Sequence, residues 1–265
     1  MKKRAAGSIL LRMPEGDTIF RAARTLNEAL AGKTVTRFET VLPKLARVDD
    51  QTPLRGRTVE RVRSSGKNLI IEFSGDLVLR THLRMNGSWH LYRAGELWHK
   101  RRDDMRLVIA TDDFEAVGFN IPVAEFQGVL AGFSRPDRLK AVATLGPDLL
   151  GQTFDLEEAV RRLREHGDEE IGNALLDQRI VAGIGNIWKS EVLFACGVSP
   201  FRKAAECEAG AILKKARAML QRSTRERPRW AVYERGGQPC RKCGTAIRRE
   251  LQNLRSTYWC PKCQM

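Results

Sequence analysis

The chain has 265 residues, of which 42% are hydrophobic, so it is long enough for one large or two modest cores and too apolar to be disordered. No apolar run approaches the roughly 20 residues of a membrane span, and Ile9–Leu11 after the basic start is too short for a secretory signal, so we expect a cytoplasmic protein. The net charge of +14, from 46 Lys+Arg against 32 Asp+Glu, favours a polyanionic partner such as nucleic acid, with solubility alone as the alternative.

The first half of the chain predicts one helix followed by many strands. Residues 1–12 show no strong pattern and are expected to form a flexible tail, or to be upstream sequence that is not normally translated. From Asp17 apolar residues recur with a helical period as far as Leu30, and Gly32 follows as a stop signal. Short stretches rich in β-branched or aromatic residues then indicate strands at Thr34–Val41, Thr58–Val62, Leu69–Phe73, Leu77–His82, Ser88–Tyr92, Met105–Ala110 and Ala116–Phe119. With a hairpin turn expected at Ser74–Asp76, this pattern favours a β-sandwich or barrel.

The second half of the chain predicts helices. Leu145–Asp148 interrupts the strand pattern, and its Gly-Pro pair cannot continue a helix, so we expect a domain boundary there. The helix candidates that follow are Phe154–Glu165, Ile171–Gln178, Ile187–Cys196 and Ala204–Ser223. After Pro228 come short segments that carry cysteines, with eight basic and two acidic residues over 228–265.

Two Cys-x-x-Cys pairs predict a metal site. Cys240 and Cys243 form one pair, Cys260 and Cys263 the other, and sixteen residues separate the pairs. Two-residue spacing lets both sulfur atoms of a pair turn toward one ion, and two such pairs complete a tetrahedral shell. No position is left for water, so we expect one structural Zn²⁺, with an iron site or disulfides as alternatives.

Zinc would fix the hairpin between the two pairs, Gly244–Trp259, which carries several arginines. A rigid tip of this kind suits insertion along a nucleic-acid groove, although many zinc ribbons bind proteins instead. Thiolate ligands need a reducing compartment, in agreement with a cytoplasmic protein. Cys196 and Cys207 stand alone, and we expect buried or neutral thiols at both positions.

A glycine-rich turn joins two of the predicted helices. Gly183 and Gly185 permit a tight turn with exposed backbone N–H groups, and Asn186 is a good N-cap for the helix that follows. Free N–H groups at a helix N-terminus bind anions, so a DNA phosphate is the expected ligand. An ordinary connection between two helices is the alternative.

The segment Met13–Ile19, with the sequence MPEGDTI, closely resembles the start of the formamidopyrimidine-DNA glycosylase / endonuclease VIII family, and its Gly-Asp-Thr continuation looks more like the endonuclease VIII branch. The resemblance includes Gly66–Asn68, the Gly183–Asn186 turn and the closing Arg255–Gln264, in the same order. It implies an α+β fold, with an N-terminal β-sandwich and flanking helices, then a helical helix–two-turn–helix domain with a zinc-ribbon β-hairpin.

The resemblance also implies a division of the chain. We expect a tail or mis-assigned start at 1–13, a catalytic β-sandwich domain at 14–144, a hinge linker at 145–153, a helix–two-turn–helix DNA-binding domain at 154–227 and a Cys₄ zinc finger at 228–265.

The activity that the resemblance implies is that of a bifunctional DNA glycosylase and abasic-site lyase of base-excision repair, acting as a monomer on damaged DNA. With Met13 removed, Pro14 would carry a free secondary amine, and the reference pKa of an α-amino group, about 7.7–8.0, leaves a fraction of it neutral at pH 7. This amine attacks C1′ of the deoxyribose, and the resulting Schiff base allows β,δ-elimination of the flanking phosphates. Glu15 would transfer protons to the opening sugar.

The resemblance implies that three further residues bind the DNA backbone. Lys67 would hold a phosphate or assist as an acid, and Asn186 and Arg255 would grip the phosphates beside the lesion. From the residues alone, the alternatives are a solvated surface lysine, a helix cap and a packing residue of the hairpin.

A damaged base must leave the duplex before it can be excised, so a side chain has to fill the space that it vacates. Met85 lies in a predicted loop and matches the family's void-filling position, with a core methionine as the alternative. The charged segment Trp98–Met105 fits no pattern of the family that we can assign.

The position of Pro14 departs from the family pattern. In the sequence as given, its nitrogen is an amide and cannot form an iminium. We expect translation to start at Met13, with removal of the tail or loss of the lyase chemistry as alternatives. The net charge would then fall from +14 to +10, because residues 1–12 contain four basic residues.

The leading hypothesis is therefore an enzyme that excises oxidised bases, pyrimidines in preference to purines, an inference that depends only on the Gly-Asp-Thr start. The second is a catalytically silent protein of the same fold that binds damaged DNA. A zinc-ribbon transcription or RNA-binding factor is a third, but it leaves the first 120 residues unexplained.

Overall fold

The computed structural model describes residues 14–128 and 140–265, so the predicted tail at residues 1–13 lies outside the described part. The chain forms two compact units. The first contains Pro14 and the chain from Thr18 to Ala143, and the second contains Glu15–Asp17 together with Thr144–Met265. Residues Glu15–Asp17 of the Met13–Ile19 segment therefore belong to the second unit.

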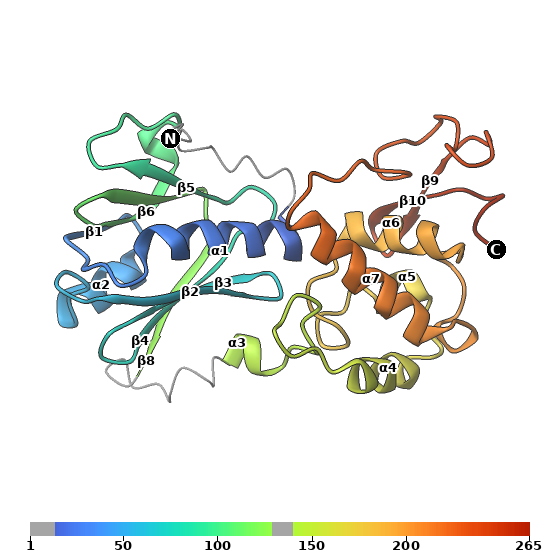
Figure 1. Ribbon diagram of the computed structural model, residues 1–265, viewed down its shortest axis with the longest axis horizontal. Coiled ribbons are helices and arrows are strands. Elements are labelled where there is room, and N and C mark those ends of the chain that lie inside the picture. Colours follow the sequence, from blue (N-terminus) through green and yellow to red (C-terminus); the bar gives the residue numbers. More distant parts are fainter. Residues whose placement is uncertain (1–13, 129–139) are drawn as a thin grey trace. The chain divides into compact units, whose positions relative to one another are not determined.

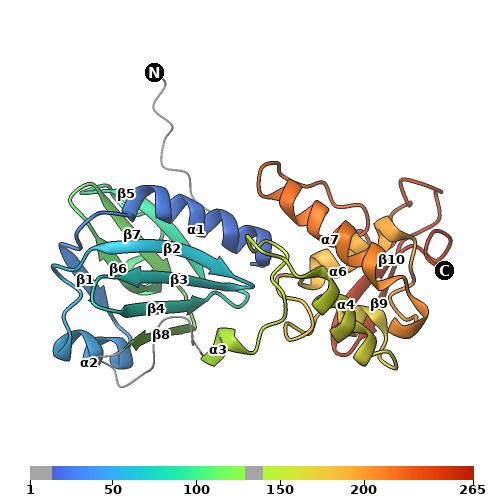
Figure 2. The same ribbon diagram turned by 60° about the horizontal axis from the view of Figure 1, so that its bottom comes forward.

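The first unit is a β-sandwich, as predicted. Its elements are α1 (Gly16–Leu30), β1 (Arg37–Thr40), α2 (Pro43–Gln51), β2 (Val59–Ser65), β3 (Asn68–Phe73), β4 (Leu77–His82), β5 (Ser88–Arg93), the 3₁₀ turn η1 (Arg102–Asp104), β6 (Met105–Ala110), β7 (Phe114–Phe119), β8 (Val123–Gly128) and α3 (Lys140–Ala143). The strands form two antiparallel four-stranded sheets, in the orders β1-β6-β7-β5 and β2-β3-β4-β8, and Figure 2 shows the second of these.

One apolar core joins the two sheets and α1 (Figure 1). Alternate residues of β3, Leu69, Ile71 and Phe73, face this core because successive side chains of a strand point to opposite faces. The stripe of α1 that contains Ile19 and Leu26 packs into the same core, which explains the helical period of the sequence.

The sequence missed α2 and β8, as well as the short η1 and α3. Within α2 only Leu45 is buried, so the helix has no apolar stripe and begins instead at Pro43, a residue that favours a first helical position. The strand β8 pairs with β4 along Val123–Gly128, at the edge of the described sheet. It is a six-residue strand that the sequence pattern did not single out.

The charged segment Trp98–Met105 covers the outer face of the first sheet. Trp98 packs edge-to-face on Phe119, with ring centroids 5.8 Å apart, and the Arg102 guanidinium lies 5.4 Å from the Trp98 ring. Tyr92 and Phe119 are buried beneath it, on the face opposite the main core. The segment therefore closes a second, smaller apolar cluster.

His90 is buried in this cluster with 2% of its surface exposed. Its Nε2 lies 3.1 Å from Ser88 Oγ, and burial, followed by the charges of Lys100 and His99, lowers the pKa of His90 from 6.5 to about 4. Between these values the unfolded state binds the proton and the folded state does not, so stability falls as the pH drops from 6.5 to 4.

We expect His90 to destabilise the first unit by about 3 kcal/mol across this range, since one pKa unit corresponds to about 1.4 kcal/mol. Urea unfolding at pH 7 and pH 4.5 measures this difference. The variant His90→Gln removes the titrating group and should show a smaller loss at low pH, with the remainder due in part to His82, whose pKa is also lowered to about 4. An unchanged pH dependence in His90→Gln would contradict the assignment.

The second unit is helical, with a two-stranded hairpin. Its elements are α4 (Leu156–Glu165), α5 (Ile171–Ala174), α6 (Asn186–Cys196), the 3₁₀ turn η4 (Ala204–Glu206), α7 (Ala209–Ser223), β9 (Arg248–Gln252) and β10 (Arg255–Trp259). Helices α4, α5, α6 and α7 share one core that includes Leu163, Leu193 and Leu213. None of the helices in the described ranges is both long and apolar enough to span a bilayer.

Two predicted helices of this unit were too long. The helix expected at Ile171–Gln178 ends at Ala174, and the Gln178 side chain instead closes the following loop through bonds to Gly183 N at 3.1 Å and Ile184 O at 2.9 Å. The helix expected at Ala204–Ser223 is divided, because Cys207 between η4 and α7 has extended backbone angles.

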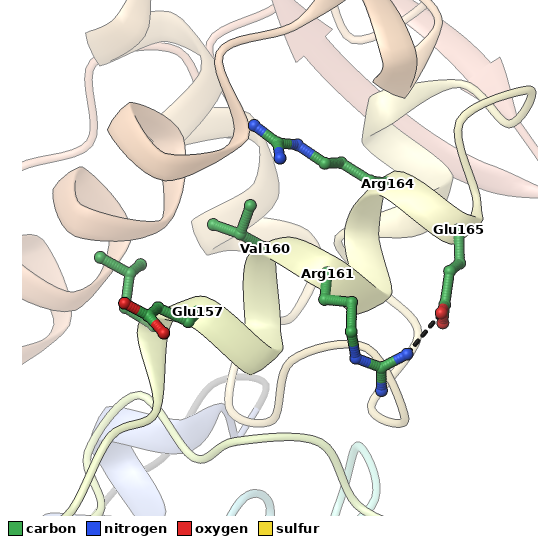
Figure 3. Close-up of a pocket in the computed structure, with 6 residues that line it drawn as sticks. Glu157, Val160, Arg161, Arg164 and Glu165 are labelled. Atoms are coloured by element: carbon green, nitrogen blue, oxygen red, sulfur yellow. Dashed lines mark hydrogen bonds and ion pairs between the residues drawn. The ribbon is translucent and has the colours of Figure 1, made fainter.

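The outer face of α4 is a solvated surface. Asp155 caps this helix by accepting a hydrogen bond from Glu158 N at 2.9 Å. Along the shallow groove drawn in Figure 3, Arg161 pairs with Glu165, and it also pairs with Glu158 at 2.8 Å. Since these charges are satisfied within the helix, the groove has no unpaired Arg161 charge to offer a ligand.

Candidate active site and metal centre

The Glu15 carboxylate is held at the N-terminus of α6. It accepts hydrogen bonds from the backbone N–H groups of Ile187 at 2.7 Å, Trp188 at 3.1 Å and Gly185 at 3.2 Å, and the side chain is 5% exposed. The helix dipole makes this a favourable place for a carboxylate. The residue next to Pro14 is therefore fixed by groups about 170 positions further along the chain.

Two glycines make this contact sterically feasible. A Cβ at Gly185 would lie 2.4 Å from Glu15 Cδ, and a Cβ at Gly16 would lie 2.8 Å from the backbone of Gly183. Gly16 N also donates to Gly183 O at 3.0 Å. The turn predicted from its glycines is present, and it is needed because two backbone segments approach each other closely.

The prediction of free N–H groups at this turn is wrong. Glu15 already binds the N–H groups of Gly185, Ile187 and Trp188, so these three donors are occupied by a carboxylate of the chain itself. The expected cap is wrong as well, because Gly185 is the N-cap and Asn186 is the first helical residue.

Asp17, two residues after Glu15, also anchors the N-terminal segment to the second unit. Its carboxylate accepts from Trp188 Nε1 at 2.9 Å and from Ser223 Oγ at 2.9 Å, and it is 2% exposed. No role for Trp188 or Ser223 was apparent in the sequence. The large sequence separation of these contacts, 171 and 206 residues, explains why local patterns did not reveal them.

Asn186 and the hairpin of Arg255 meet in the second unit. Asn186 Nδ2 donates to Ser256 O at 2.7 Å, and Ser256 is the neighbour of Arg255 at the start of β10. The Arg255 side chain is exposed. The arrangement leaves its guanidinium available to a ligand and brings its backbone against the first residue of α6.

Lys67 and Met85 lie in the first unit. Lys67 occupies the turn between β2 and β3, and its charge, with those of Arg84 and Arg80, adds to burial in lowering the pKa of His82 to about 4. Met85 is 67% exposed in the loop between β4 and β5, so it is not a core residue. This end of β4 therefore combines positive charge with an exposed apolar side chain.

Pro14 is buried and lies two residues before the start of α1 at Gly16. In the 265-residue chain its nitrogen is acylated by Met13. The nucleophile expected from the sequence is thus adjacent to the anchored Glu15, and its reactivity depends on where the chain begins.

The four predicted ligand cysteines form one cluster. All four sulfur atoms lie within 4.8 Å of one another, with Cys240 Sγ 3.9 Å from Cys263 Sγ and Cys243 Sγ 3.5 Å from Cys260 Sγ. A tetrahedral site with Zn–S bonds of about 2.3 Å separates its sulfur atoms by about 3.8 Å. The cluster therefore fits one structural zinc ion.

Two buried side chains outside the cysteine cluster support the zinc ribbon. The Glu191 carboxylate accepts from the backbone N–H groups of Ala231, Val232 and Tyr233 at 2.8–2.9 Å. Gln264 accepts from Cys260 N at 2.8 Å and donates to Val198 O at 2.9 Å. Neither residue was singled out in the sequence.

Three family models match successive parts of the chain. The formamidopyrimidine-DNA glycosylase N-terminal domain matches residues 13–120, the H2TH domain of the same glycosylase matches residues 145–228, and the zinc finger found in FPG and IleRS matches residues 237–264. The chain belongs to the formamidopyrimidine-DNA glycosylase family. The resemblance expected from four short motifs is thereby confirmed.

Within this family the chain is similar to proteins named endonuclease 8. It is 40% identical to the probable endonuclease 8 2 of Streptomyces coelicolor, over 95% of this chain and 94% of the relative. It is 38% identical to the DNA-(apurinic or apyrimidinic site) lyase Nei2 of Mycolicibacterium smegmatis, over 95% of this chain and 99% of the relative.

The fold is that of glycosylases of this family. The Lactococcus lactis formamidopyrimidine-DNA glycosylase, crystallised with DNA that contains an abasic site, matches with a TM-score of 0.80 over 95% of this chain and 99% of that chain. The sequence identity is 23%, so the match concerns the fold alone. The predicted α+β class with its zinc-ribbon hairpin is confirmed.

Proposed function

We propose that this chain is a DNA glycosylase and abasic-site lyase of base-excision repair that removes oxidised bases through a Schiff base at Pro14. Family membership supports the enzyme class. The observation that carries the catalytic assignment is the Glu15 carboxylate, which is fixed by three backbone N–H groups directly beside the nucleophile. We propose that the enzyme acts on DNA in the bacterial cytoplasm, as the bacterial origin of the relatives favours.

The reaction begins when the Pro14 amine attacks C1′ of the damaged nucleotide and the base leaves with the electrons of the glycosidic bond. The alkylated nitrogen passes its proton to the Glu15 carboxylate, which transfers it to the sugar oxygen as the ring opens, and the lone pair freed on nitrogen forms the iminium. Loss of a C2′ proton then expels the 3′ phosphate, and a second elimination expels the 5′ phosphate. The zinc ion takes no part in these steps and fixes the hairpin that carries Arg255.

The remaining assigned residues bind the substrate. Lys67 holds a phosphate or assists as an acid, while Asn186 and Arg255 grip phosphates beside the lesion. Met85 fills the space of the extruded nucleotide, a role that its 67% exposure supports. The exposed Arg255 and the contact of Asn186 with the neighbouring Ser256 support a joint role for these two residues.

The active form in this proposal begins at Pro14, because an amide nitrogen cannot form an iminium. The family model supports this start, since its match to the chain begins at residue 13. Met13 would be removed to expose the secondary amine.

Borohydride trapping tests the mechanism. Two proteins, one beginning at Pro14 and one with all 265 residues, are incubated with abasic-site duplex and sodium borohydride, which reduces an iminium to a stable amine. We expect a covalent adduct with the first protein, and we expect Pro14→Gly with an added residue in front of it to give none. An adduct formed equally well by chains with blocked termini would overturn the assignment of Pro14.

The lesion preference is tested separately. We propose that oxidised pyrimidines are preferred, on the basis of the Gly-Asp-Thr segment at Gly16–Thr18, and expect thymine glycol to be excised at least about tenfold faster than 8-oxoguanine. Faster excision of 8-oxoguanine than of thymine glycol would show that the enzyme prefers oxidised purines. Binding of both lesions without excision or adduct would support the catalytically silent DNA-binding protein instead.

A further inference from the structure

Lys189 is a lysine without any exposed surface. It lies in α6, one turn after Asn186, and is among the largest fully buried side chains of the described chain. Its Nζ donates to Thr257 Oγ1 at 2.6 Å and reaches Gln252 Oε1 at 3.4 Å. Both acceptors belong to the hairpin that carries Arg255, so this lysine joins the helix to the hairpin.

The contact continues into a buried polar network. Thr257 Oγ1 donates to Gln252 Oε1 at 3.2 Å, and Gln252 Nε2 donates to Glu170 Oε2 and to Pro200 O, each at 2.8 Å. Gly172 leaves room for this arrangement, because a Cβ there would lie 2.4 Å from Gln252 Oε1. The network gives the hairpin a defined position against the helices of the second unit.

Successive residues of β10 contact one face of α6. Asn186 binds the backbone of Ser256, Lys189 binds the side chain of Thr257, and Ser190 Oγ accepts from Tyr258 N at 3.5 Å. Arg255 begins this strand and is therefore placed by the same contacts. Of the three helix side chains, only Lys189 carries a charge.

The surroundings of Lys189 favour the arrival of an anion. Its acceptors are neutral oxygens, and burial is the main cause that lowers the pKa of Lys189 to about 8, with a further contribution from the charge of Arg255. The charges of Glu15 and Glu170 raise the pKa of Lys189, but by less than burial and the Arg255 charge lower it. Among residues 14–128 and 140–265, the contacts of this ammonium are to neutral oxygens and not to a carboxylate. A buried ammonium in such surroundings is costly, and a phosphate bound beside Arg255 would reduce that cost.

We propose that Lys189 is a positioning residue for DNA binding, whose buried ammonium holds the β9–β10 hairpin against α6 so that Arg255 and Asn186 meet the same stretch of DNA backbone. The inference rests on the proposed function, since it assumes that these two residues bind phosphate. It adds a residue outside the motifs that define the family resemblance.

Equilibrium binding of the zinc-loaded chain that begins at Pro14 to a duplex with a tetrahydrofuran abasic analogue tests this proposal without any chemical step. Lys189→Met keeps the length of the side chain and removes the charge. Because Arg255 is then no longer held in place for its phosphate contact, we expect affinity to fall roughly tenfold and the salt-dependence slope to fall by about one. The melting temperature should stay the same or rise, because an apolar group then replaces a buried charge. The zinc content should be unchanged.

Two further variants sharpen the result. Lys214→Met removes one exposed lysine from α7 and should leave affinity and slope unchanged. Thr257→Val removes the acceptor of Lys189 and should weaken binding, while the double variant Lys189→Met/Thr257→Val should bind no more weakly than Lys189→Met alone.

Wild-type affinity and salt slope in Lys189→Met would overturn the proposal. So would an affinity loss that appears only with lost zinc or a lowered melting temperature, because Lys189 would then be a packing residue. If the wild-type chain itself fails to bind the abasic duplex, the proposed function fails, and that outcome is distinct from equal binding by wild type and variant.

Discussion

Replacement of Glu15 by glutamine is expected to lower the single-turnover rate of base excision by about 10²- to 10⁴-fold, the usual contribution of a positioned acid–base group. The substitution removes the carboxylate that accepts and passes on the proton. It also turns an NH₂ donor toward a site where Gly185, Ile187 and Trp188 already donate, so one of these buried donors loses its acceptor. Quenched-flow cleavage of a lesion duplex at saturating enzyme measures the rate.

The matched control is Glu157→Gln, the same substitution at an exposed glutamate of α4, which should keep the wild-type rate. Gly185→Ala provides an independent test of geometry. Its added Cβ would lie 2.4 Å from Glu15 Cδ and must displace the carboxylate, so a comparable loss is expected. Gly210→Ala, where the added Cβ meets only Val160 Cγ2 at 3.9 Å, should be silent. A fully active Glu15→Gln enzyme would exclude Glu15 as the proton donor.

Removal of zinc is expected to abolish DNA binding while leaving the helices of the second unit folded. The ion closes a cluster of four cysteines that fixes the β9–β10 hairpin, and structural zinc contributes roughly 10–16 kcal/mol of apparent binding energy in zinc-finger peptides. Chelation should release one zinc ion per chain, with loss of binding to an abasic duplex and little change in helical circular dichroism. The helices have a separate apolar core, which includes Leu163 and Leu213.

Cys260→Ser should reproduce this loss, because it removes one ligand. Cys207→Ser is the control, since Cys207 is half-buried between η4 and α7, outside the cluster, and its replacement should retain both zinc and binding. Full binding by a zinc-free chain would show that the hairpin is ordered without the metal.

Local periodicity revealed much of the fold, and its failures have physical causes. The stripe of α1 and the alternation of β3 were readable because each element buries one face. The helix α2 buries only Leu45, so its sequence carries no periodic signal. The helix predicted at Ile171–Gln178 was too long because the Gln178 side chain takes part in the turn that follows.

In the candidate site, too, local patterns predicted the contacts between residues close in sequence and missed those between distant residues. The cysteine spacing predicted the metal site because all four ligands come from two short segments. The anion at α6 was assigned to DNA and is in fact Glu15, a residue about 170 positions away in sequence. One available signal was overlooked, since Lys189, Ser190 and Glu191 stand together inside an otherwise apolar helix, and all three are buried.

The division of the chain at Ala143 and Thr144 has a practical consequence for protein engineering. A recombinant fragment that stops at this linker would carry Pro14 but none of the backbone amides that immobilise Glu15, nor the partners of Asp17. Such a truncated module should be inert even when it is well folded. Chimeras between relatives would therefore have to take residues 14–17 and the C-terminal half from the same parent.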